Sequence, residues 1–98
     1  MKFSPARRLI KEKLASGEIQ HEARKEIDKK NKLSTGELTP DEVSKFLDRA
    51  TFNDFETSPH DKDPNTTVYV FKPLVDGTRW YIKAYFIEPD VWFISVHK

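Results

Sequence analysis

The chain contains no cysteine among its 98 residues. Disulfides, thiolate nucleophiles and cysteine-based zinc sites are therefore excluded. This absence is compatible with the reducing cytoplasm, and we expect a cytoplasmic protein. Long hydrophobic runs are absent as well, since no stretch approaches the roughly 20 apolar residues of a membrane span. The first residues carry charges every few positions, unlike a signal peptide, and we expect no membrane partner.

Glycine is also scarce, and three glycines are too few for a glycine-rich phosphate-binding loop. The three histidines are isolated in the sequence, without metal-ligand spacing, and no local pattern marks a Ser-His-Asp triad. The segment 61–65 spaces its oxygen-bearing side chains as a calcium loop begins, but Thr66 replaces the required glycine and Lys72 the required acid. We therefore expect a solvated turn there, no metal and no cofactor.

Charged residues make up 34% of the chain and apolar residues 37%, which predicts one compact, soluble domain spanning residues 1–98. The net charge of +1 is unevenly distributed. Residues 1–33 hold ten basic and five acidic side chains, giving +5, whereas residues 34–66 hold three and eight, giving −5. A basic first third is suited to contacting phosphates, but it is also the ordinary surface of a solvated helix. Charge alone leaves both interpretations open.

The first half of the chain carries helix signals. Ser4 as N-cap, Pro5 at the first helical position and Gly17 after the last one predict a helix over 4–17. A weaker helix is predicted over 18–33, where three apolar residues recur four positions apart.

The most clearly marked helix is predicted over 39–50. Thr39, Pro40 and Glu42 open it with a capping box, and apolar residues follow at helical spacing. Phe52 and Phe55 then follow as expected aromatic anchors, before a polar loop from about residue 58 to 65.

From residue 66 the hydrophobic period changes to two. Three runs rich in β-branched and aromatic residues follow, separated by connections short enough for hairpins. These predicted strands are 66–73, 78–88 and 91–98. The expected fold class is therefore α+β, with N-terminal helices packed on one face of an antiparallel β-meander and the other face left open.

The stretch 80–86, WYIKAYF, is predicted to place two phenols and an ammonium group on that open face. Tyr81, Lys83 and Tyr85 alternate along it, and the residues between them are apolar core positions. On the last strand two alternate sets are possible, and the one with the more polar end is favoured. Its members are Val91, Phe93, Ser95 and His97.

An aromatic and basic sheet face is suited to single-stranded RNA, because bases stack on rings and cations contact phosphates. Cleaving RNA without a metal requires proton transfer and cations that stabilise the phosphorane. His60 or His97 are candidates to exchange protons, Tyr81 to orient or donate, and Lys83 or Lys98 to stabilise charge. Further candidate RNA contacts are Tyr85, Lys72, Arg79, Arg7 and Lys11. One alternative is a non-catalytic module that binds RNA or a protein partner through the same open face. Another is an ordinary exposed strand, on which Tyr and Lys are common.

Four ordered runs, DFETS (54–58), VFKPLVDG (70–77), YIK (81–83) and ISVHK (94–98), resemble the MqsR family of toxins. Those proteins are small RelE-like ribonucleases encoded beside a neutralising antitoxin. The resemblance implies a RelE-like fold, metal-independent cleavage of single-stranded mRNA, and a cognate antitoxin protein as partner. It covers about residues 45–98, and the first 40 residues match only in layout.

The resemblance also implies site residues, since family members are thought to use a tyrosine, two lysines and a glutamine. The tyrosine falls on Tyr81, and the C-terminal lysine falls on His97, or on Lys98 with a shift of one residue. The other lysine falls on Thr57, and the glutamine falls near Thr67 or Val68. These departures leave three possibilities: a site rebuilt with His60 and His97, RNA binding without cleavage, or a resemblance to the RelE-like fold alone.

Overall fold

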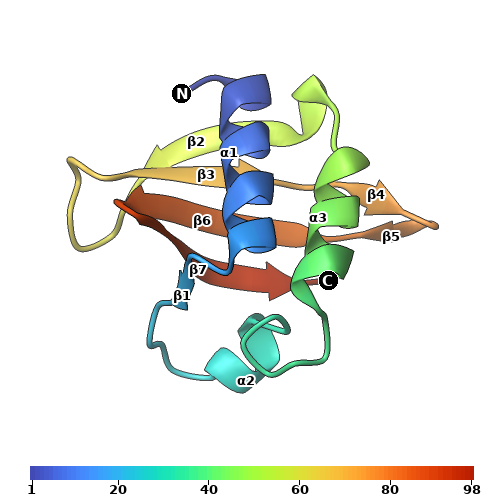
Figure 1. Ribbon diagram of the computed structural model, residues 1–98, viewed down its shortest axis with the longest axis horizontal. Coiled ribbons are helices and arrows are strands. Elements are labelled where there is room, and N and C mark those ends of the chain that lie inside the picture. Colours follow the sequence, from blue (N-terminus) through green and yellow to red (C-terminus); the bar gives the residue numbers. More distant parts are fainter.

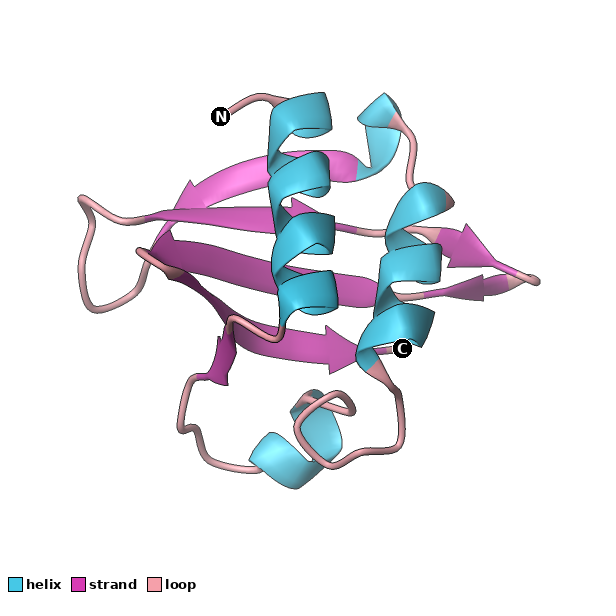
Figure 2. Cartoon of the chain, viewed as in Figure 1, coloured by secondary structure: helices cyan, strands magenta, loops and turns pink.

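Two helices, α1 (Phe3–Ser16) and α3 (Pro40–Asp48), lie side by side across one face of a β-sheet in the computed structural model, which describes residues 1–98 (Figures 1 and 2). The strands of this sheet are β1 (Ile19–His21), β2 (Phe55–Pro59), β3 (Thr67–Phe71), β6 (Tyr81–Ile87) and β7 (Asp90–His97). The smaller elements are α2 (Ile27–Lys30), the 3₁₀ turn η1 (Phe52–Asp54) and the hairpin of β4 (Leu74–Val75) and β5 (Thr78–Arg79). The expected mixed fold, with helices on one face of a mostly antiparallel sheet, is confirmed.

The sheet has five strands in the order β1-β7-β6-β3-β2. The predicted three-stranded meander is its centre, β3-β6-β7, and one further strand is added at each edge. β2 pairs antiparallel with β3, and β1 pairs parallel with β7. β2 lacked a sequence signal because it is polar and ends at Pro59, which an edge strand tolerates since one side needs no hydrogen-bond donors.

The helix predicted over 18–33 is wrong. Its first residues form β1, and only the four residues of α2 are helical. Gly17 ends α1 in the left-handed conformation, with φ of 82°, and turns the chain back toward the sheet. Ile19 then lies opposite Val91 on β7 and packs against the core. Pairing with a strand edge thus outweighs a weak helical pattern that had little surface to bury.

The capping signals behave differently in the two long helices. At α3 the predicted capping box is present, with the Glu42 amide donating to Thr39 Oγ1 at 3.2 Å and the Thr39 amide donating to Glu42 Oε1 at 2.9 Å. α1 begins at Phe3, earlier than predicted, and Ser4 makes no capping bond. Pro5 still lies in the first turn, where its missing N–H costs nothing.

The main core lies between the two helices and the sheet. Its fully buried members include Ala6, Ile10, Val43, Leu47, Phe71, Ile82, Phe93 and Val96. Phe55 packs against this core as expected, but Phe52 does not, because 73% of its surface is exposed. A second small cluster on the open face holds Val68, Val70, Tyr85 and Ile94. Neither α1 nor any other helix combines the length and apolar character needed to span a bilayer.

Candidate nucleic-acid interface

Strand β6 divides its side chains between the two faces as predicted. Ile82 and Ala84 are fully buried in the helix-side core, whereas Tyr85 belongs to the cluster on the open face. Tyr81 and Lys83 alternate with the core residues and are partly exposed on that same open face. The open face is therefore a real surface of the molecule, since no helix covers it (Figure 1).

A β-bulge in β7 splits the predicted face of the last strand. Lys83 lies opposite Ser95, but the next residue of β6 lies opposite Phe93, so Ile94 is the extra residue. As a result Ser95 and His97 share the open face with Tyr81 and Lys83. Val91 and Phe93, predicted to join them, point instead into the helix-side core. Within β7, every second residue faces the same side of the sheet both before and after the bulge. Across the bulge this alternation is interrupted, so Phe93 and Ser95 face opposite sides.

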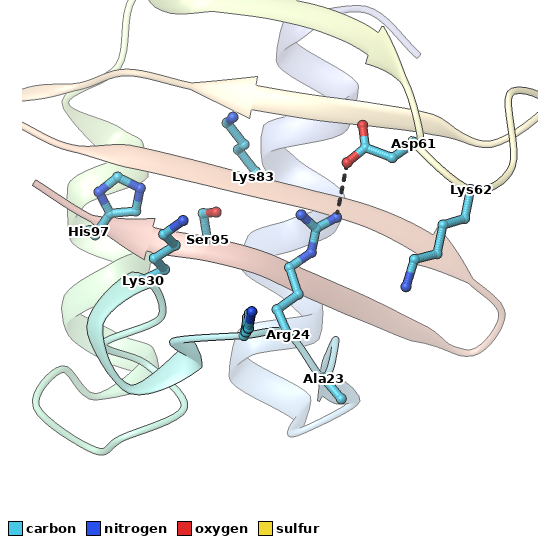
Figure 3. Close-up of a pocket in the computed structure, with 9 residues that line it drawn as sticks. Ala23, Arg24, Lys30, Asp61, Lys62, Lys83, Ser95 and His97 are labelled. Atoms are coloured by element: carbon cyan, nitrogen blue, oxygen red, sulfur yellow. Dashed lines mark ion pairs between the residues drawn. The ribbon is translucent and has the colours of Figure 1, made fainter.

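A pocket of about 490 Å³ opens beside these residues (Figure 3). Three separate segments form it: the chain from β1 to α2, the loop after β2, and the paired strands β6 and β7. We call it the basic pocket, and its lining residues are Ala23, Arg24, Lys25, Lys30, Asp61, Lys62, Lys83, Ser95 and His97. Its volume lies within the range of roughly 300–1,000 Å³ that is usual for ligand sites.

The basic pocket carries a large excess of positive charge. Five lining cations against one lining carboxylate give +4 with a neutral His97. Arg24 Nη2 lies 3.7 Å from Asp61 Oδ2, the one ion pair among the lining residues (Figure 3). Lys25, Lys30, Lys62 and Lys83 take part in none of the ion pairs of the molecule. Cations gathered in a concave surface favour an anionic ligand.

Tyr81 and His97 form a ring pair at the edge of this pocket. They lie opposite each other on β6 and β7, with ring centroids 5.6 Å apart and an angle of 23° between the planes. The Lys98 backbone oxygen accepts a hydrogen bond from His97 Nδ1 at 3.1 Å, so the neutral ring carries its hydrogen on Nδ1 and leaves Nε2 unprotonated. The pair thus presents a phenol and a proton-accepting nitrogen beside the pocket cations.

Lys72 reaches the same ring pair from the end of β3. Its Nζ lies 5.9 Å from the centre of the Tyr81 ring and 3.0 Å from Glu56 Oε1. Arg79, by contrast, is held by its neighbours: Nη1 donates to Asp54 Oδ1 at 3.0 Å and to the Lys72 carbonyl at 2.7 Å. Of these two predicted RNA contacts, Lys72 lies beside the Tyr81–His97 ring pair. Arg79 instead stabilises the turn that follows Lys72.

Three predicted site cations lie on the helix side of the sheet. Arg7 Nη1 donates to the Ala50 carbonyl at 3.0 Å, and Lys11 pairs with Asp48 at 2.7 Å, so both hold the end of α3 against α1. Lys98 Nζ lies 6.0 Å from the ring of Trp80, which packs against the helix-side core. The structure therefore does not bring Arg7, Lys11 or Lys98 together with Lys83.

His60 is buried and both of its ring nitrogens are occupied. Nε2 donates to Glu22 Oε1 at 2.5 Å, and Nδ1 accepts from the Lys62 amide at 3.0 Å. This geometry does not support the predicted proton transfer to a substrate, because no ring nitrogen faces the pocket. Tyr85 is buried too: its ring lies parallel to that of Trp92, and its hydroxyl donates to Glu22 Oε1 at 3.0 Å. A stacking contact between Tyr85 and RNA is likewise unsupported.

The phenol of Tyr85 makes the stability of the fold sensitive to alkali. Burial, followed by the nearby Glu22 carboxylate, raises the pKa of Tyr85 to about 12, from 10.0 in the unfolded chain. A raised pKa means that the folded state retains the Tyr85 proton to higher pH than the unfolded chain does, so the contribution of Tyr85 to stability is constant below pH 10 and decreases between pH 10 and 12. We expect a loss of about 2–3 kcal/mol over that window, at 1.36 kcal/mol per pKa unit. Urea unfolding of Tyr85→Phe should lack this decrease, and an equal decrease in the variant would contradict it.

The sequence did not indicate that most cations of the basic pocket belong to a site. The one indication was the net charge of +5 over residues 1–33. Arg24, Lys25 and Lys30 fell within a predicted helix, and Lys62 fell within a predicted solvated loop. At the positions suggested by the toxin resemblance, Thr57 is exposed on β2, whereas Val68 is buried in the open-face cluster. Val68 therefore supplies packing near the position where the resemblance led us to expect a glutamine.

Comparison with known proteins adds no family to this description. No protein-family model matches the chain, and no curated protein matches it either. Function must therefore be argued from the pocket and its residues.

Proposed function

We propose that this chain is a metal-independent endoribonuclease of RelE-like fold, acting as the toxin of a toxin–antitoxin module in the cytoplasm. The observation that carries this proposal is the basic pocket with the Tyr81–His97 pair at its edge. Unpaired lysines favour a phosphate backbone, and the ring pair adds proton-transfer groups at the same place. The resemblance to MqsR-type toxins points to the same residue, Tyr81.

Cleavage in this proposal follows the usual chemistry of metal-free ribonucleases. The 2′-hydroxyl attacks the adjacent phosphorus, and His97 Nε2 accepts its proton. Lys83 stabilises the negative charge that develops on the phosphorane oxygens. Tyr81 donates a proton to the 5′-oxygen as the P–O bond breaks. The products are a 2′,3′-cyclic phosphate and a 5′-hydroxyl, so neither water nor a metal is consumed in this step.

The helix side of the sheet is the part of the molecule we assign to the antitoxin. Arg7 and Lys11 bind groups at the end of α3, and both lie on the opposite side of the sheet from the basic pocket. A groove of about 580 Å³ runs along α1 there, lined in part by Arg8 and Glu12. Docking on that side leaves RNA access to the pocket unaffected, so neutralisation would act by sequestering the toxin from its target or by altering its conformation.

The test is incubation of the purified protein with a long mRNA in EDTA. We expect fragments that end in a 2′,3′-cyclic phosphate, and we expect induction in a bacterium to stop growth. The departures at Thr57 and Val68 favour one second candidate, a module that binds RNA without cleaving it. Salt-dependent binding of intact RNA would support that candidate, and an absence of both cleavage and binding would exclude both.

A further inference from the structure

The three segments that form the basic pocket are joined by a single carboxylate, Glu22. This residue follows β1, and its backbone amide donates to the Phe93 carbonyl at 2.9 Å, which fixes it against β7. Only 14% of its side-chain surface is exposed. A carboxylate in that position must be compensated by hydrogen bonds, since an unpaired buried charge is strongly destabilising.

The side chain of Glu22 accepts three hydrogen bonds, from donors in three different parts of the chain. Oε1 accepts from His60 Nε2 at 2.5 Å and from Tyr85 Oη at 3.0 Å, and Oε2 accepts from Arg24 Nε at 2.5 Å. Burial raises the pKa of Glu22, but the bonds from Arg24, His60 and Tyr85 outweigh it, and the net pKa is lowered from 4.5. The group therefore stays ionised at neutral pH.

Each of these bonds connects to a wall of the basic pocket. Arg24 lines the basic pocket itself, and it also lines a smaller recess of about 90 Å³ that shares Asp61, Lys83 and Ser95 with the basic pocket. His60 lies in the loop after β2, which forms the second wall of the pocket. Its Nδ1 accepts a hydrogen bond from the backbone amide of Lys62, another lining residue. Tyr85 belongs to β6, the strand that also carries Lys83. One carboxylate thus links the three segments that together supply the five pocket cations.

We propose that Glu22 is a positioning residue that holds the cations of the basic pocket, above all the guanidinium of Arg24, in the arrangement that binds the RNA backbone. This inference rests on the proposed function for its RNA ligand. It has an unusual consequence, since removing a negative charge next to an RNA site ordinarily strengthens binding. Removing the charge of Glu22 weakens binding instead, because Arg24 and the loop around His60 lose their anchor.

Asp61 supplies the matched control. It is the second acid that contacts Arg24, at 3.7 Å, but it is exposed and lies at the mouth of the pocket. Asp61→Asn removes the same unit of charge from the same arginine without disturbing the buried network. Glu22→Gln keeps one oxygen for His60 and Tyr85 but places an amide N–H₂ opposite Arg24 Nε. The two variants are therefore expected to change RNA affinity in opposite directions.

The experiment measures binding of a single-stranded 2′-O-methyl oligonucleotide, which lacks the attacking hydroxyl, over a series of salt concentrations. We expect Glu22→Gln to raise Kd about tenfold and to reduce the salt slope by about 0.7, the value for one lost phosphate contact. We expect Asp61→Asn to lower Kd about threefold. Equal or tighter binding by folded Glu22→Gln, with an unchanged salt slope, would overturn the proposal.

A second measurement separates failure of this inference from failure of the proposed function. The ¹H–¹⁵N NMR signal of Arg24 Nε reports its fixation without any RNA present. We expect slow solvent exchange in the unmodified protein and in Asp61→Asn, and fast exchange in Glu22→Gln. If the protein binds no RNA, the proposed function fails while this signal still decides whether Glu22 positions Arg24. If Glu22→Gln does not fold, Arg24→Lys, which keeps the charge but loses Nε, must reproduce the reduced salt slope.

Discussion

Replacing Lys83 with alanine is expected to slow RNA cleavage about 10²- to 10³-fold, the usual effect of removing one group that stabilises a transition-state charge. Lys83 lies on β6 two residues from Tyr81 and opposite Ser95, so a strand rather than a loop fixes its backbone. Its ammonium group takes part in none of the ion pairs of the molecule. Among the pocket cations, Lys83 is the one on the strand that carries Tyr81, and its partner Ser95 lies two residues from His97 on β7.

The matched control is Lys25→Ala, which removes an exposed cation from the chain between β1 and α2. Binding should weaken slightly in this variant, as expected for the loss of one phosphate contact, while the single-turnover rate at saturating protein stays within a few-fold. The measurement is cleavage of a short labelled RNA in EDTA. Full activity of the double variant Tyr81→Phe/Lys83→Ala would remove both residues from the mechanism. Equal losses in Lys25→Ala and Lys83→Ala would reduce the role of Lys83 to general electrostatics.

The parts of this fold that follow from sequence are those with local causes. The α3 capping box depends on Thr39 and Glu42, three residues apart, and it forms as predicted. The two faces of β6 depend on alternation within one strand, and Tyr81 and Lys83 lie on the open face as expected. The helix-side core follows similarly, because apolar spacing within each element determines the side that is buried.

The parts that escaped prediction depend on pairing between distant segments. β1 is a strand because it pairs with the edge of β7. The residues of β7 that it pairs with lie more than 70 positions later in the sequence. The bulge at Ile94 arises where β7 pairs with β6, and it decides that Ser95 rather than Phe93 faces the pocket. Arg24, Lys25 and Lys62 come from loops, and the Glu22–His60 contact joins those two loops. No local periodicity encodes any of these contacts.

Replacing Phe71 with alanine is expected to be the most destabilising of the changes considered, at about 3–5 kcal/mol. Phe71 ends β3 on the helix side, and none of its surface is exposed. Its ring centroid lies 5.0 Å from that of Phe55 and 6.1 Å from that of Phe3, so it joins the edge of the sheet to the start of α1. Truncation leaves a cavity that two ordered elements, β3 and α1, are unable to close.

Phe52→Ala is the control of identical chemistry for that change. With 73% of its surface exposed, Phe52 contacts Phe3 only by its edge, at a centroid distance of 6.4 Å. Its loss should change stability by about 0.5 kcal/mol or less. Thermal unfolding separates the two, because for a domain of this size each kcal/mol shifts the Tm by about 4–8 °C. Comparable Tm values for the two variants would show that the ring cluster at Phe71 contributes no more than a surface contact, and the core would then rest on the aliphatic residues of α1 and α3.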